Sequence, residues 1–80
     1  LTQVTYSLRL SQPSELIQLS ANAANDARTL FWFADQTLLG QSTPQQGLSW
    51  RPEHSGKFQL RVSDDLGRSS SRTLRVEFLP

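Results

Sequence analysis

The feature that most constrains this chain is an alternation of apolar and polar residues with the period of a β-strand. It is clearest in residues 4–10, 58–63 and 74–78, where every second residue is apolar and the residues between are polar. Residues 17–21 show the same pattern over a shorter stretch. Strands with one apolar and one polar face are typical of antiparallel sheets that cover a core on one side. No segment carries a helical stripe of apolar residues, so we expect an all-β fold.

Three further strands complete the pattern. Residues 30–34 are apolar on both faces, which indicates a central strand that places Trp32 in the core. Short strands are expected at 37–39 and 48–51, and turn-forming Gly, Pro, Asn, Asp and Ser residues separate the strands. Seven short strands predict an immunoglobulin-like antiparallel β-sandwich. The length suits one domain over residues 1–80, and packing alone must join its two sheets because the chain has no cysteine.

Strand parity constrains the last hairpin. If Asp64–Gly67 formed a four-residue loop, Ser63 would lie opposite Arg68 and Leu74 would point to solvent. A shift of one residue moves a whole apolar face to the wrong side of a sheet. We therefore expect either a loop of odd length or a β-bulge between Arg68 and Thr73.

The overall composition excludes several classes of protein. The net charge is +1, from eight Lys and Arg residues and seven Asp and Glu residues, which gives no support to nucleic-acid binding. No apolar run approaches the length of a membrane span, so we expect no direct membrane insertion. Because the chain begins at Leu1 and shows no signal peptide, we expect a part of a longer protein whose anchor lies outside it. We expect no cofactor and no metal, and a monomer for the isolated domain.

The titratable residues that could act in catalysis or bind a metal also have simpler structural interpretations. His54, the one histidine, is interpreted as a solvated turn residue; the alternative is a general base, which would need an oriented nucleophile nearby. Asp64 and Asp65 are interpreted as turn formers. The alternative for this pair is a calcium site, although such loops supply more oxygen ligands at defined spacing.

Aromatic and basic residues suggest a surface for a partner. If Trp32 faces the core, Phe31 and Phe33 face away from it, where they are either covered by a neighbouring side chain or form a patch for a protein or a sugar. Trp50 raises the same question, with the core as its simpler location. The positions of basic residues on solvent-facing sides of the strands are explained by solvation, or alternatively by contact with an anionic polymer. The basic residues in question are Arg9, Arg51, Arg61 and Arg75.

Several segments also resemble a known family. These segments are Leu30–Gly40, Leu48–Pro52, Gly56–Arg68 and Leu74–Val76. In order and spacing they resemble the C-terminal domain of the bifunctional penicillin-binding protein 1C group, and the resemblance covers most of residues 15–80. The chain departs from the pattern at Gln36–Thr37, where a glycine is expected in the hairpin turn.

The resemblance implies a host protein that is anchored in the bacterial inner membrane and faces the periplasm. That host would carry a glycosyltransferase domain and a transpeptidase domain with a serine nucleophile. This chain lacks the Ser-x-x-Lys motif of the transpeptidase, since its one lysine is Lys57 and His54 stands three positions before it. We therefore expect no enzyme activity here. Two roles remain open: docking on the host's transpeptidase domain or another periplasmic protein, or binding of peptidoglycan. The expected surface for either role comprises Phe31, Phe33, Trp50, Arg61 and Arg75.

Overall fold

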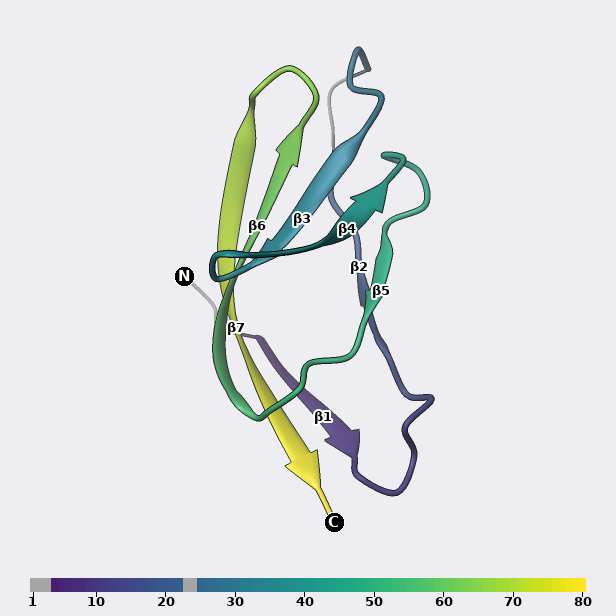
Figure 1. Ribbon diagram of the computed structural model, residues 1–80, viewed down its shortest axis with the longest axis vertical. Helices are drawn as coiled ribbons and strands as arrows, with labels where there is room; N and C mark the ends of the chain where they lie inside the picture. The colour runs from purple at the N-terminus through teal and green to yellow at the C-terminus, as the bar shows by residue number, and fades with distance from the viewer. Residues whose placement is uncertain (1–3, 23–24) are drawn as a thin grey trace.

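The structure is a computed structural model that describes residues 4–22 and 25–80, and these residues form seven β-strands (Figure 1). The strands are β1 (Val4–Arg9), β2 (Ile17–Leu19), β3 (Leu30–Ala34), β4 (Thr37–Ser42), β5 (Leu48–Trp50), β6 (Gly56–Asp64) and β7 (Ser69–Leu79). The described residues contain no helix. The predicted all-β class and the seven predicted strand positions are therefore confirmed.

The strands form two sheets. The larger sheet has five strands in the order β1-β7-β6-β3-β4, and the smaller sheet pairs β2 with β5 in antiparallel orientation. In Figure 1, the long β6–β7 hairpin runs along the long axis of the molecule, and β2 and β5 lie beside each other. The inner faces of both sheets contribute to one apolar core.

The larger sheet is mixed, because β1 runs parallel to β7. Val4 lies opposite Leu74 and Arg9 lies opposite Leu79. The prediction of a purely antiparallel fold was wrong for this pair of strands. The physical reason is the path of the chain: β1 leads into β2, which belongs to the other sheet, so β1 does not meet its neighbour through a hairpin. Alternation of period two is the same in parallel and antiparallel strands and does not distinguish them.

The core is built from the apolar positions of the alternating strands. Trp32 is 4% exposed, as its place in the central strand predicted, and its Nε1–H donates to Ser42 Oγ over 2.9 Å. Trp50 and Phe58 join the two sheets through an edge-to-face contact with ring centroids 5.1 Å apart. The other buried members are Leu8, Ile17, Leu19, Leu30, Ala34, Leu60, Leu74 and Val76. Leu10 was predicted to continue the apolar face of the first strand, but β1 ends at Arg9 and Leu10 is 60% exposed.

The β6–β7 hairpin has an odd loop, one of the two predicted solutions. Phe58 lies opposite Leu74, and Ser63 lies opposite Ser69. The Asp64 N–H donates to the Arg68 carbonyl over 2.8 Å, which leaves the three residues 65–67 in the loop. The register then runs without a shift, so the alternative bulge between Arg68 and Thr73 is not present.

A glycine was expected at Gln36–Thr37, but the residue with a positive φ in the turn of the β3–β4 hairpin is Asp35. Ala34 pairs with Thr37, so Asp35 and Gln36 form the turn, and Asp35 adopts a φ of +54°. Aspartate tolerates this left-handed region better than most residues. The Asp35 backbone N–H donates to the Gln59 carbonyl over 2.8 Å, and its carboxylate accepts the Gln59 N–H over 3.1 Å. These contacts hold the turn against β6.

Candidate functional site

The outer face of the larger sheet carries an apolar cluster at β3 and β4. Phe33 lies directly opposite Leu38 on one side and Arg61 on the other, so the three side chains share a face. Phe31, two residues earlier on β3, lies on that face as well. Phe31 and Phe33 are half-buried, and Leu38 is 53% exposed. We call Phe31, Phe33, Leu38 and Arg61 the outer patch.

A cation–π contact organises the outer patch. The Arg61 guanidinium carbon lies 4.2 Å from the centroid of the Phe33 ring. A guanidinium over an aromatic face is attracted by the ring quadrupole and also covers part of the ring. The guanidinium thus covers part of the half-buried Phe33 ring, and the patch combines apolar area with a positive charge.

The structure separates the remaining predicted surface residues from the outer patch. Trp50 lies in the core at 9% exposure, so its simpler interpretation is correct and it offers no surface platform. Arg75 lies on β7 opposite Lys57, whereas Arg61 lies opposite Ser71 on the same pair of strands. Four residues along a strand correspond to roughly 13 Å. Arg75 instead lies near Glu77, with 3.9 Å between its Nε and a carboxylate oxygen.

Two residues have roles that the sequence analysis did not identify. Leu38 joins the outer patch, and the register of a two-residue turn after Ala34 was a signal that could have placed it opposite Phe33. Arg51, which was assigned to a wet face, binds backbone. Its guanidinium donates to the carbonyls of Arg9, Gln12 and Glu15 over 3.1, 3.1 and 2.8 Å. Arg51 thus fastens the β1–β2 connection to the end of β5.

His54 occupies a structural position beside the core. Its ring stacks on Phe58 with centroids 4.9 Å apart, and Nδ1 donates to the Ser55 carbonyl oxygen over 2.8 Å. This contact fixes the proton on Nδ1 and uses one ring face for packing. Among the described residues, no hydrogen bond joins His54 to a hydroxyl group that it would activate as a base.

Asp64 and Asp65 bind backbone amides, as turn-forming residues do. Asp65 accepts the N–H groups of Arg28 and Thr29 over 2.9 and 3.3 Å, and these bonds lower its pKa below the usual 3.8. Burial acts to raise the pKa of Asp64, but hydrogen bonds from the Arg68 and Leu66 N–H groups and the Arg68 side chain outweigh it, so this pKa is also lowered. Both carboxylates are therefore charged and occupied at neutral pH.

This pair predicts a loss of stability in acid. Because each folded-state pKa lies below 3.8, the stabilising contribution is complete well above that pH and is lost as the pH falls through the folded pKa values. Urea unfolding at pH 7, 4, 3 and 2 should show a falling free energy of unfolding. The double variant Asp64→Asn, Asp65→Asn should be less stable at pH 7 and should lose less on acidification. The control Glu53→Gln, at an exposed carboxylate, should follow the unsubstituted chain; an unchanged acid slope in the double variant would contradict this account.

Neither a metal-binding group of side chains nor a membrane-spanning helix is found in the described part of the chain. Within it, no three His, Cys, Asp or Glu side chains are grouped as a metal site would require. It also holds no helix long and apolar enough to cross a membrane.

Comparison with known proteins gave one result. The sequence of residues 2–78 matches a family described as the Penicillin-Binding Protein C-terminus Family. No curated protein and no solved structure matches the chain.

Proposed function

Because this chain belongs to the Penicillin-Binding Protein C-terminus Family, we propose that it is a non-catalytic accessory domain of a bifunctional peptidoglycan synthase. The proposed domain spans residues 1–80 and is an immunoglobulin-like sandwich. The proposed host is anchored in the inner membrane, faces the periplasm, and carries the glycosyltransferase and transpeptidase activities. The domain serves that host as a docking module.

The titratable side chains support a non-catalytic role. A catalytic base needs a nucleophile within hydrogen-bond reach, and a catalytic carboxylate needs a free oxygen facing substrate. His54 is stacked on Phe58, and the carboxylates of Asp64 and Asp65 accept backbone amides. These groups stabilise turns and are committed to that task.

The outer patch carries the docking proposal. Phe31, Phe33 and Leu38 present apolar surface on the solvent side of a sheet, where polar residues are expected. Aromatic residues and arginine are the types enriched where proteins bind one another. The partner that fits is an apolar surface with a carboxylate near Arg61, on the host's transpeptidase domain or on a periplasmic protein.

The position of Arg61 favours a protein partner over a sugar. A sugar ring that stacks on an aromatic side chain needs an open ring face. On Phe33 the guanidinium already lies over the ring at 4.2 Å, so stacking there would have to displace it. A carboxylate from a protein partner could instead pair with the guanidinium in place.

The proposal is tested by titrating the ¹⁵N-labelled chain with the host's transpeptidase domain and, separately, with soluble peptidoglycan fragments. We expect amide shifts at residues 31, 33, 38 and 61 with the protein domain. Leu38→Asp should weaken this binding by roughly ten-fold or more, because it places an unpaired charge in the centre of the patch. The matched control is Leu66→Asp, since Leu66 is 56% exposed in the β6–β7 loop.

The titration also separates the alternatives. Shifts at the outer patch with peptidoglycan fragments alone would replace docking by glycan binding. Equal binding by the Leu38 and Leu66 variants would remove the outer patch from the proposed interface.

A further inference from the structure

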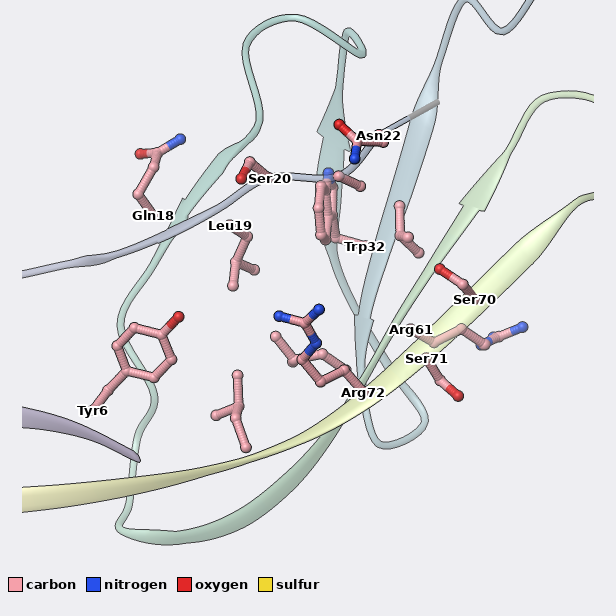
Figure 2. Close-up of a pocket in the computed structure, with 14 residues that line it drawn as sticks. Tyr6, Gln18, Leu19, Ser20, Asn22, Trp32, Arg61, Ser70, Ser71 and Arg72 are labelled. Atoms are coloured by element: carbon pink, nitrogen blue, oxygen red, sulfur yellow. The ribbon is translucent and has the colours of Figure 1, made fainter. Parts of the chain in front are cut away.

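A second surface lies between the two sheets, on the core-facing side of the larger sheet, and Arg61 of the outer patch is among the residues that border it. Figure 2 shows a cavity bordered by β2 and the residues after it on one side and by β7 on the other; its volume is about 660 Å³. A second hollow of about 210 Å³ shares four lining residues with it and continues towards Arg68. The shared residues are Ala21, Asn22, Val62 and Ser70. Together the two form an elongated groove along the first half of β7, which we call the β7 groove.

The first half of β7 contributes polar residues to the floor of the β7 groove at core-facing positions, beside apolar residues such as Trp32 and Leu60. Leu74 and Val76 face the core from β7 and are 3% and 1% exposed. By the period of a strand, Ser70 and Arg72 occupy the same face, opposite Val62 and Leu60. The smaller sheet does not cover this end, because β2 ends at Leu19. An arginine therefore occupies a core-facing position in an uncovered part of the sandwich.

Arg72 is available to a ligand. Figure 2 shows its guanidinium pointing into the cavity, whereas the side chain of Arg61 points away from it. Among the described residues, Arg72 takes part in no ion pair or side-chain hydrogen bond. Arg68, by comparison, is engaged by Asp26 and Asp64. A planar guanidinium without a protein partner is suited to a carboxylate, which it can bind through two parallel hydrogen bonds.

The edge of β7 beside the groove offers backbone groups. Asp64 and Arg68 form a hydrogen-bonded pair, so the amides of the even-numbered β7 residues point to β6 and those of the odd-numbered residues point away. The latter are Ser69, Ser71 and Thr73 in this segment. The pairing of β1 with β7 begins at Val4 and Leu74, and within residues 4–22 and 25–80 no strand pairs with this edge. A strand edge that none of the described strands occupies is a template for another extended chain.

From these features we infer that the β7 groove binds an extended peptide segment that bears a carboxylate side chain. The peptide adds as a strand to the edge at residues 69–73, and its inward-facing carboxylate pairs with Arg72. The elongated shape favours an extended chain over a compact molecule. Arg61 and Arg68 also border the groove, but the Arg61 side chain points away from the cavity and Arg68 is paired with Asp26 and Asp64. Arg72 therefore sets the charge of the side chain that enters. The competing explanation is that Arg72 is an inward-pointing charge that prevents strands from pairing at this edge.

Two blocked heptapeptides of alternating valine and threonine test the inference, one with a central glutamate and one with glutamine there. Each is titrated into the ¹⁵N-labelled chain, and glutarate alone serves as the free carboxylate. We expect the glutamate peptide to shift the amides of Ser69, Ser71 and Thr73, which lie on the pairing edge. The glutamine peptide should bind roughly ten-fold more weakly, as expected for loss of a charge-assisted pair.

Variants on the two faces of β7 complete the test. Arg72→Gln should reduce the affinity for the glutamate peptide to that of the glutamine peptide, whereas Arg75→Gln, on the outer face of the same strand, should leave it unchanged. Equal affinity of the two peptides, or a response to glutarate as strong as that to the glutamate peptide, would overturn the inference. Absence of shifts at the edge with either peptide would also overturn it, and would favour the explanation that Arg72 prevents strands from pairing at this edge.

Discussion

Replacement of Trp32 by alanine is expected to destabilise the chain by about 3–5 kcal/mol. The indole is 4% exposed on β3, between β6 and β4 in the five-stranded sheet, so its removal leaves a cavity that the surrounding strands fill only in part. It also leaves Ser42 without the Nε1–H donor at 2.9 Å. For a chain of this size such a loss approaches the whole stability of roughly 4–12 kcal/mol. Urea denaturation at pH 7, followed by circular dichroism, measures it.

The neighbouring aromatic residue provides the control for Trp32. Phe31 lies on the same strand but faces the solvent side of the sheet and is only half-buried. Phe31→Ala should therefore cost much less, about 1–2 kcal/mol. A loss for Phe31→Ala equal to that for Trp32→Ala would contradict the assignment of the two faces of β3.

Gly47→Ala is expected to cost at least about 2 kcal/mol, although it adds a single methyl group at the surface of the smaller sheet. Gly47 has a φ of +68°, which L side chains rarely adopt. A Cβ atom there would lie 2.2 Å from the carbonyl oxygen of Leu19, so the backbone itself must move. The pairing of Leu19 with Leu48 is next to this contact and would be disrupted.

Gly67 provides the matched control, because it also has a positive φ, at +90°, but an added Cβ would meet no atom within 4 Å. Gly67→Ala should cost only about 1–2 kcal/mol, the strain of the backbone alone. Thermal unfolding compares the two variants, and hydrogen exchange at the Leu19 and Leu48 amides locates the damage. Similar losses for both, with unchanged exchange at β2 and β5, would show that the close approach at Gly47 is relieved without disturbing the smaller sheet.

Local patterns predicted the strands well, because each strand buries one face and leaves the other wet. The parity of Phe58 and Leu74 required either an odd loop or a β-bulge in the last hairpin, and the structure has the odd loop. The pairing of strands that lie far apart in the sequence was not predictable in the same way. The parallel pairing of β1 with β7 depends on the path of the chain between the two sheets, which no local period records.

The candidate site was also predictable only in part, because local alternation places side chains on a face but does not give the pairing between strands. The alternation around Trp32 was enough to place Phe31 and Phe33 on the outer face. The contact of Arg61 with Phe33 depends on the register between β3 and β6, which only the folded sheet defines. Arg72 shows most clearly what local sequence patterns do not predict. Its position on β7 predicts a core-facing side chain. That face is open because β2 ends early, which only the structure shows.

Photo-crosslinking in the full-length protein tests the central proposal most directly. A photoreactive amino acid replaces Leu38 in one version and Leu66 in another, two side chains of similar exposure at 53% and 56%. The docking proposal predicts crosslinks from position 38 to the host's transpeptidase domain, identified by mass spectrometry of the joined peptides, and little or none from position 66. Equal crosslinking from both positions, or none from position 38, would contradict the assignment of the outer patch as the docking surface.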